Sequence, residues 1–417
     1  MARSPLTLAA TVTSALPQAS VVGVAALTEH AAGRYDTAVA DLADGSRVVV
    51  RVATDPDAAA ELVAETHALR ALTSGVRSLL PFRAPVLHGQ TVLDGMPAVV
   101  VSHLEGYRVD AAHVPAGPGA ATSLGTAIAA VHSLPVSVAR TQPLPISTPE
   151  QVRSQRSRLL DRVAGSDRVP VSLLARWSRA LAEDRLWRFE PTLTLGGVGA
   201  DAFLFHDIGD EPRVSALLDW HGLRVADPAE DLRWLSAAPA AADDVVDAYL
   251  AASVRTPDAA LLTRARLYAE LEFAKWLVHG HDEGRDDIVD DAVALLTTLA
   301  DTVLGDDLLT EDGVDVEDAI ALLGRVPAPQ GGATSMETDA FGADDTAFFT
   351  DSVAEPTEPG EPGPDQTGPV GAGPDDDPDA TAPITASDWV GRGGDADAVA
   401  DADRASEAAL RRWATPQ

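Results

Sequence analysis

Residues 193–235 carry the pattern that decides how this chain folds. The stretch reads Leu-Thr-Leu-Gly-Gly-Val-Gly-Ala-Asp-Ala-Phe-Leu at 193–204, Leu-Leu-Asp-Trp-His-Gly at 217–222 and Asp-Pro-Ala-Glu-Asp-Leu at 227–232. Short apolar runs at 192–195, 202–205 and 214–218 are typical of strands. An aspartate followed by proline, as at 227–228, is typical of a capped helix start. The stretch therefore predicts short strands joined by loops and leading into a helix.

This stretch resembles the active-site segment of the aminoglycoside and macrolide phosphotransferase family, whose members are distant relatives of protein kinases. In that family the segment is His-Gly-Asp-Leu, three variable residues and Asn, then Asp-Trp or Asp-Phe, then Gly-Asp-Pro-x-x-Asp. The matching residues here are Gly196, Leu204, Asp219, Trp220, Asp227, Pro228, Asp231 and Leu232. The resemblance is strong at 193–235 and diffuse elsewhere over residues 20–305. It implies an α+β, two-lobed protein-kinase-like fold with a strand-rich N-lobe and a helical C-lobe.

Three positions depart from the family pattern. Leu195 stands for the His, Gly197 for the catalytic Asp and Ala202 for the metal-binding Asn. Loss of a general base costs on the order of 10²–10⁴ in rate, and a lost oxygen ligand weakens a magnesium site. We therefore expect no intact catalytic residue and a pseudokinase-like domain that acts as a nucleotide-binding or scaffold protein.

Two alternatives stay open at this stage. One is an active transferase of phosphate from ATP or GTP onto a hydroxyl of a small molecule such as an antibiotic, with Asp201 or a water in place of the base. Strand alternation points Asp201 either towards the cleft or away from it. The other is a platform that binds neither nucleotide nor small molecule.

The resemblance also implies a weak site for ATP or GTP with Mg²⁺. Arg51, in Val-Val-Val-Arg-Val at 48–52, occupies the place of the phosphate-anchoring lysine, and Glu65 matches the helix glutamate that orients that cation. Asp219 stands where relatives bind magnesium. Asp231 matches a residue that braces the loop before it through backbone contacts. An Arg51–Glu65 pair is expected, although an ordinary exposed acid at 65 fits the spacing equally well.

Weaker signals were weighed at other positions. The loop 29–35 lies where a phosphate-covering turn would be but has one glycine, and 105–106 would form the crossover between lobes. His132 is expected to pack at a helix end, with a role in a site as the alternative. His206-Asp207 belongs to a surface turn without a catalytic role. His279 to Glu283 offers zinc ligands but is expected to be a polar turn between helices.

We divide the chain into a strand-rich lobe at 1–105, a helical lobe at 106–325 and a disordered tail at 326–417. Asp-Gly pairs at 44–45 and 94–95 predict hairpin turns. Helices are expected at 5–16, 55–72, 120–134, 149–163 and 172–182 and up to about 323, a strand at 20–27, and a hairpin around the active-site loop at 192–220. The tail has eleven prolines and 19 acidic residues against 4 basic ones, so it cannot bury enough apolar surface to fold alone.

Composition narrows the partners. The 417 residues include no cysteine and carry a net charge of −33, and Lys275 is the only lysine. Such acidity disfavours nucleic acid and anionic membranes and suits a cationic ligand such as an aminoglycoside. Phenylalanines at 341, 348 and 349 among acids would suit transient docking of the tail on a protein partner, with a purely solvating tail as the alternative. The run at 4–28 is only weakly apolar, so we expect a cytoplasmic protein without a signal peptide.

Overall fold

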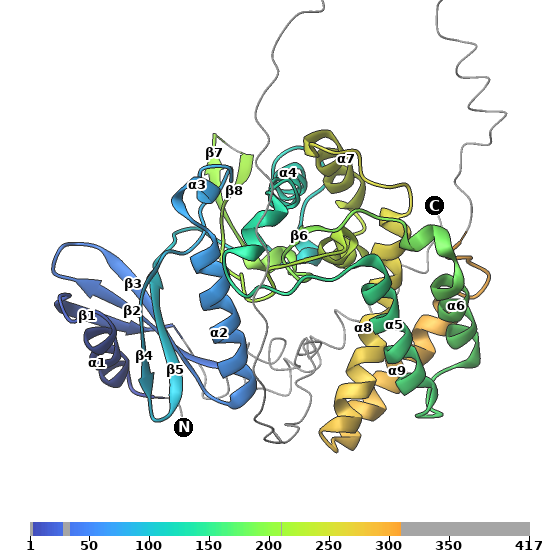
Figure 1. The fold of residues 1–417 in the computed structure, drawn as a ribbon, viewed down its shortest axis with the longest axis horizontal. Coiled ribbons are helices and arrows are strands. Elements are labelled where there is room, and N and C mark those ends of the chain that lie inside the picture. The colour runs from blue at the N-terminus through green and yellow to red at the C-terminus, as the bar shows by residue number, and fades with distance from the viewer. Residues whose placement is uncertain (1–2, 28–33, 210, 310–417) are drawn as a thin grey trace, which may run out of the picture. The chain divides into compact units, whose positions relative to one another are not determined.

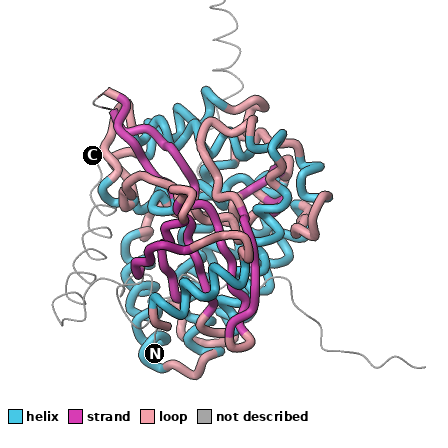
Figure 2. The backbone as a smooth tube through the Cα atoms, turned by 90° about the vertical axis from the view of Figure 1, so that its left-hand side faces the viewer, coloured by secondary structure: helices cyan, strands magenta, loops and turns pink. Residues whose placement is uncertain are grey.

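The computed structural model describes residues 3–27, 34–209 and 211–309. Its N-terminal lobe is built on a five-stranded antiparallel sheet with strand order β1-β2-β3-β5-β4. Figure 2 looks onto this lobe and shows the strands side by side. The strands are β1 (Val21–Ala26), β2 (Tyr35–Leu42), β3 (Arg47–Ala53), β4 (Leu87–Leu93) and β5 (Met96–Ser102).

Two helices cover opposite faces of this sheet, and side-chain alternation decides which residues meet each helix. On one face, Val48, Val50 and Val52 of β3 pack with α1 (Pro5–Ala15) in a small apolar core. The other face packs against α2 (Pro56–Ala71), whose first turn is capped by Asp55 accepting from the Ala58 N–H at 2.8 Å. Arg51 alternates with the three valines and therefore faces α2.

The helical lobe follows the turn α3 (Ser74–Arg77) and the strand β5 (Figure 1). Its α-helices are α4 (Ala120–His132), α5 (Pro149–Ala164), α6 (Val171–Ala182), α7 (Ala242–Ala252), α8 (Leu261–Asp282) and α9 (Asp286–Thr302). Its 3-10 helices are η1 (Ala111–His113), η2 (Val136–Arg140), η3 (Asp184–Trp187), η4 (Ala200–Ala202) and η5 (Pro228–Ala237). One large apolar core, including the fully buried Trp177 and Trp220, joins these helices to α2.

Four short strands lie in the helical lobe and form two separate pairs. The strands are β6 (Thr192–Thr194), β7 (Phe203–Ile208), β8 (Glu211–Leu217) and β9 (Arg224–Ala226). β7 and β8 form an antiparallel hairpin, whereas β6 pairs with β9. The two-lobed α+β fold predicted from the sequence is confirmed.

Both predicted hairpin turns in the N-lobe are confirmed. Gly45 has φ +84° between β2 and β3, and Asp94 and Gly95 have φ +54° and +81° between β4 and β5. Positive φ is the conformation that tight hairpin turns require, and glycine adopts it without steric cost. The helices of the N-lobe and those that begin at 120, 149 and 171 differ from the expected bounds by one or two residues.

The sequence interpretation was wrong in its details around the 192–220 hairpin. The hairpin is β7 with β8 only, and β6 takes its partner from β9, a three-residue strand that the sequence did not indicate. The helix expected after Asp227 is 3-10 rather than α. The last described helix ends at Thr302. The tail at 326–417 lies outside the described residues, so its predicted disorder stays a prediction.

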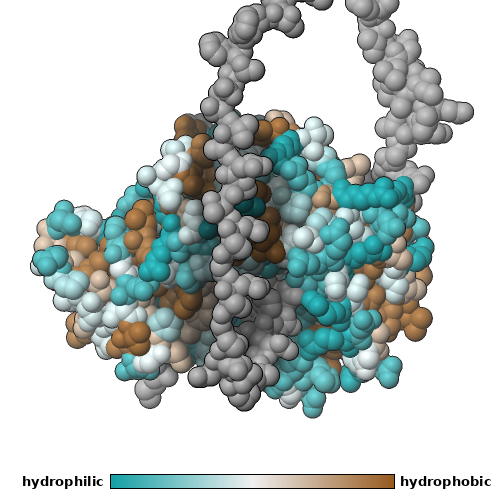
Figure 3. All heavy atoms as spheres, viewed as in Figure 1, coloured by the Kyte–Doolittle hydropathy of each residue, from teal (hydrophilic) through white to brown (hydrophobic). Residues whose placement is uncertain are grey.

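The surface agrees with the charged composition. On the face seen in Figure 3, hydrophilic side chains cover much of the helical lobe and hydrophobic patches are scattered. No helix in the described ranges is long and apolar enough to cross a membrane.

Candidate functional site

Arg51 and Glu65 form an ion pair between the sheet and the helix that packs on it. The Arg51 Nη1 donates to Glu65 Oε2 at 2.5 Å, and the guanidinium lies 4.3 Å above the ring of Tyr35. Glu65 is 3% exposed. Burial alone would lower the pKa of Arg51, but the negative charges of Glu65 and Asp219 reverse this and raise it. The guanidinium is thereby fixed in place and remains charged.

The Glu65 carboxylate is only partly satisfied by this pair. Its Oε1 is buried and has no hydrogen-bond partner among the described residues. Burial and the negative charge of Asp219 raise the pKa of Glu65, while Arg51 lowers it. Asp219, which follows β8, therefore lies near enough to the Arg51–Glu65 pair to interact with both residues electrostatically. The structure brings together three of the residues that the sequence predicted for a nucleotide site.

Asp201 lies in the 3-10 turn η4 and joins this group from the helical lobe. Its side chain is exposed at the rim, but partial desolvation and the nearby Asp219 carboxylate raise its pKa, with Arg108 opposing them. The sequence left open which way Asp201 points. Its carboxylate lies beside Gly199, where an added Cβ would be 2.5 Å from Oδ1, and near enough to Asp219 to interact with it electrostatically.

The loop 195–202, which joins β6 to β7 and contains η4, takes near its start a shape that only glycine adopts easily. Gly196 and Gly197 have φ of +76° and +86°, in the left-handed region that strains other residues. A Cβ added to Gly197 would lie 1.4 Å from Nη1 of Arg233. Arg233, on η5, also donates from Nη1 to the Gly196 carbonyl at 3.3 Å. A guanidinium therefore occupies the place where a side chain at 197 would begin.

The fully buried Asp231 holds the same loop through its backbone. Its carboxylate accepts hydrogen bonds from the backbone N–H groups of Leu195 and Gly197, both at 2.6 Å. His132 Nε2 donates to it at 3.0 Å, and the Tyr249 hydroxyl lies 2.9 Å from His132 Nδ1. His132 is thus more than a packing residue at the end of α4. It links the loop to α7.

The two other residues that depart from the family pattern, Leu195 and Ala202, lie in the apolar core. Leu195 is 1% exposed and Ala202 is 4% exposed, and both belong to the main apolar core. Apolar side chains that pack in a core make no polar contact with a ligand. Neither position offers a nitrogen or oxygen side-chain ligand.

The remaining candidates from the sequence do not join this site. Asp207 lies in the β7–β8 hairpin, where it accepts a hydrogen bond from the Tyr107 hydroxyl. His279 stacks on Trp276 near the end of α8. Among the described residues no group of three or more His, Asp or Glu could hold a metal ion. Within the loop 29–35, only residues 34 and 35 are described.

Arg233 is the residue at the site that the sequence did not reveal. It belongs to no motif, and its approach to the loop depends on how the 3-10 helix η5 packs. The only sequence signal was indirect: two consecutive glycines at 196–197 leave a space that a neighbouring side chain must fill.

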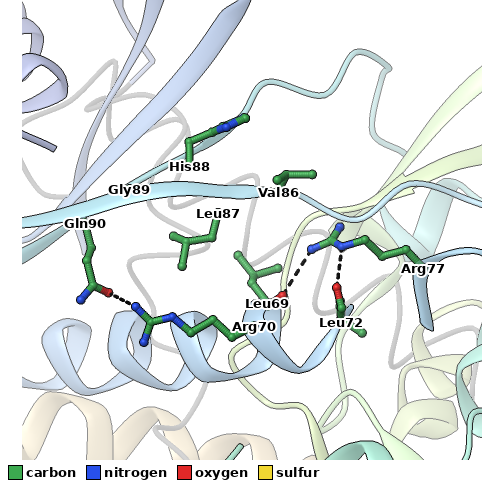
Figure 4. A pocket seen from close by; sticks show the side chains of 9 residues that line it. All are labelled: Leu69, Arg70, Leu72, Arg77, Val86, Leu87, His88, Gly89 and Gln90. Carbon is green, nitrogen blue, oxygen red and sulfur yellow. Dashed lines mark hydrogen bonds between the residues drawn. The ribbon is translucent and has the colours of Figure 1, made fainter. Parts of the chain in front are cut away.

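A pocket of about 360 Å³ lies apart from this site, between the end of α2 and β4 (Figure 4). Leu69, Leu72 and Leu87 contribute apolar surface to it. Arg77 donates to backbone carbonyls of the turns that flank it, including Leu72 at 2.7 Å and Ala84 at 2.7 Å. None of its lining residues belongs to the site above.

Comparison with known proteins agrees with the fold. The family model described as "Phosphotransferase enzyme family" matches residues 26–268. No curated protein matches the chain. Among solved structures, the macrolide 2′-phosphotransferase apoenzyme from Brachybacterium faecium is 22% identical, with a TM-score of 0.57 over 70% of this chain and 97% of that one.

Two nucleotide complexes are also similar. A GDP complex of an aminoglycoside 2′-phosphotransferase-IIIa mutant is 17% identical, with a TM-score of 0.59 over 72% of this chain and 99% of that one. The GDP and kanamycin complex of APH(2″)-IIIa is 18% identical, with a TM-score of 0.57 over 70% and 97%. At these identities the likeness shows a shared fold.

Proposed function

Because this chain belongs to the phosphotransferase enzyme family, we propose that it is a catalytically degenerate member that still binds a nucleotide weakly. The observation that carries the proposal is the Arg233 guanidinium, which fills the place where the side chain of residue 197 would begin. A cation there cannot accept the proton of an attacking hydroxyl. Phosphoryl transfer in this fold depends on a carboxylate in that role.

The nucleotide site of the proposal is built from Arg51, Glu65 and Asp219. The planar Arg51 fork would contact phosphate oxygens, and Glu65 holds it in place. Carboxylate oxygens suit a hard cation, and Asp219 adds to burial in raising the pKa of both Glu65 and Asp201. Asp219, with Asp201 near it, would hold Mg²⁺, which would neutralise phosphate charge. Mg²⁺ keeps several of its waters and therefore needs few protein ligands. Because the protein supplies so few, binding is weak.

Relatives support the nucleotide but leave its identity to experiment. Two structures of similar fold contain GDP, while nothing in this chain distinguishes ATP from GTP. A cytoplasmic location, where both are abundant, belongs to the same proposal. A protein partner for the tail at 326–417 also remains a proposal.

An active transferase is the second candidate, and one observation favours it. The raised pKa of Asp201, caused by partial desolvation and by Asp219, would make this carboxylate a better proton acceptor than an ordinary aspartate. Asp201 lies in η4, however, four residues beyond the Gly197 position. To act as the proton acceptor, Asp201 would need the acceptor hydroxyl in a different place from the one beside residue 197.

The test is calorimetric titration of the full chain with ATP and with GTP, with and without Mg²⁺. We expect millimolar binding that depends on magnesium, and about a tenfold loss in Asp219→Asn, because one charged ligand is removed. Asp207→Asn, an exposed aspartate on the β7–β8 hairpin, is the matched control and should bind as the wild type. Absence of binding at millimolar nucleotide would overturn the nucleotide part of the proposal.

A turnover assay separates the two candidates. Transfer of labelled phosphate from ATP or GTP onto a panel of hydroxyl-bearing acceptors is measured for the wild type and for Asp201→Asn. The proposal expects no turnover above background in either protein. Robust turnover by the wild type that disappears in Asp201→Asn would establish the second candidate instead.

A further inference from the structure

Six charged side chains form a partly buried cluster beside the 195–202 loop, on the helical lobe. We call it the basic cluster, and its members are Arg156 on α5, Arg224 on β9, Glu230 and Arg233 on η5, and Glu272 and Lys275 on α8. Glu230 accepts from Arg156 at 2.5 Å and from Arg224 at 2.6 Å. Glu272 accepts from Lys275 at 2.7 Å and lies 3.6 Å from the Nε of Arg233.

The group around Glu230 and the group around Glu272 interact electrostatically. Arg156 helps to lower the pKa of Glu272, and Lys275 helps to lower that of Glu230. Within these six side chains four cations share two carboxylates, an excess of two positive charges; Asp227, which also acts on Arg156, is bound to Arg264. The whole chain has a net charge of −33, so this local excess of positive charge is opposite in sign to the net charge of the molecule.

Two observations show that the cluster is strained although its arginines pair with Glu230 and Arg156 also lies over the Tyr268 ring. The Nε atoms of Arg156 and Arg224 are buried and form no hydrogen bond within the described part of the chain. Arg156 is 9% exposed as a residue. Unpaired buried donors are costly, and an uncompensated charge in a partly desolvated place is costlier still. Burial, followed by the neighbouring Arg156 and Arg233, lowers the pKa of Lys275 to about 8 despite Glu272.

The cluster is still open enough to be reached. The side chains of Arg224, Arg233 and Lys275 are 20%, 14% and 19% exposed. Arg233 lies against the loop that would carry the catalytic residue in an active enzyme. A small ligand that reached the cluster would therefore lie beside that loop, on the helical lobe.

From these contacts we infer that the basic cluster is a binding site for a small ligand with a carboxylate or phosphate group. The anion supplies counter-charge and accepts hydrogen bonds from the partly exposed Arg224, Arg233 and Lys275 side chains. Such hydrogen bonds between charged groups are short and strong. A polycationic aminoglycoside would be repelled there, even though the acidity of the whole chain favours cations. The inference does not depend on nucleotide binding.

The experiment uses the full chain at neutral pH and low ionic strength. Inorganic phosphate and malonate are titrated separately by calorimetry, so that the two arms distinguish a phosphate from a carboxylate ligand. We expect saturable binding to one site for at least one of them. Lys275→Met and Arg224→Gln should each weaken it by about tenfold or more, because each loses a charged partner of the anion.

Two further variants make the outcome decisive. Arg285→Gln removes an exposed arginine paired with Asp287 and should leave anion binding unchanged. Arg51→Gln should also leave it unchanged, because Arg51 belongs to the nucleotide site. The inference is overturned if neither anion binds saturably, if Lys275→Met and Arg224→Gln bind as the wild type, or if Arg285→Gln loses as much affinity as they do. It is equally overturned if binding is lost in Arg51→Gln, since the anion would then occupy the nucleotide site.

Discussion

At the scale of single residues, the consequential feature is that the Arg233 guanidinium lies where a side chain at 197 would begin. Gly197→Asp would place a Cβ 1.4 Å from Arg233 Nη1 at a φ of +86°. We expect it to lower the free energy of unfolding by more than the roughly 1–3 kcal/mol of backbone strain alone, and to create no transferase activity. Urea unfolding measures the loss of stability, and the labelled-phosphate assay tests for transferase activity.

A matched control separates strain from collision. Gly45 has a similar φ of +84° with nothing within 4 Å of an added Cβ, so Gly45→Asp should show the strain alone. Adding Arg233→Ala to Gly197→Asp should recover the difference between the two glycine variants. A Gly197→Asp protein as stable as Gly45→Asp would mean that Arg233 moves aside freely, and the argument for a blocked position would fail.

Asp231 is the second residue with a sharp expectation. Asp231→Asn replaces one acceptor oxygen with a donor that faces a backbone N–H, in a fully buried place. We expect a loss of about 2–4 kcal/mol in the free energy of unfolding, because a buried donor is left unpaired and the charge that held three donors is removed. Urea unfolding measures it, with exposed Asp207→Asn as the control. Equal stability of the two variants would contradict the bracing role.

Motif matching in the sequence pointed to Asp231, Asp219 and Glu65, which keep the family's residue types, and to Arg51, which replaces a lysine with another cation in the same strand pattern. It could not point to Arg233. That side chain is six residues from Asp227 in sequence, but its contact with Gly197 spans 36 positions and arises only when η5 packs under the loop. Contacts of that kind depend on tertiary packing, which periodicity does not encode.

At the scale of elements, the Arg51–Glu65 pair couples β3 to α2. Glu65→Leu should lower the free energy of unfolding by about 3–5 kcal/mol, because it leaves a mostly buried guanidinium without its partner. The double variant Arg51→Met with Glu65→Leu should recover most of this loss, since two apolar side chains of similar size can pack where the ions lay. Denaturant unfolding of the two single variants and the double variant gives the coupling energy. Additive losses would show that the pair does not act as a unit.

The elements themselves were predictable to different degrees. The N-lobe hairpins were marked by Asp-Gly turns, and α2 by Asp55 and Pro56 at its start, since these signals are local. β9 was not marked, because three residues are too few to show alternation and its partner β6 lies about 30 residues earlier. The sequence did not indicate that η5 is a 3-10 helix, because its start is held by tertiary contacts. Asp227 before it, and Glu230 and Asp231 within it, are bound by side chains from α8, α5 and α4.

At the scale of the whole molecule, the cross-linking of helices by buried carboxylates predicts how stability responds to acid. The pKa of Glu230 and that of Glu272 are each lowered to about 2 by the surrounding cations, although burial opposes this. Each therefore contributes stability that is fully present above about pH 4.5 and is lost as pH falls towards about 2. The shift corresponds to about 3 kcal/mol for each group at most.

Other carboxylates act in the opposite direction, so the test compares variants rather than the wild type alone. Burial raises the pKa of Glu65 and of Asp227, and protonation of these two groups therefore stabilises the fold relative to the unfolded chain. Below its isoelectric point of about 4.4 the chain also becomes net positive, and repulsion among its cations then opposes compaction. In Glu230→Gln and Glu272→Gln the free energy of unfolding should already be low at neutral pH, and it should fall less steeply between about pH 4.5 and 2 than in the wild type. Denaturant unfolding at closely spaced pH values measures these slopes. Parallel slopes in all three proteins would show that the two carboxylates keep ordinary pKa values in the fold, and that the cations of the basic cluster do not bind them as tightly as their distances imply.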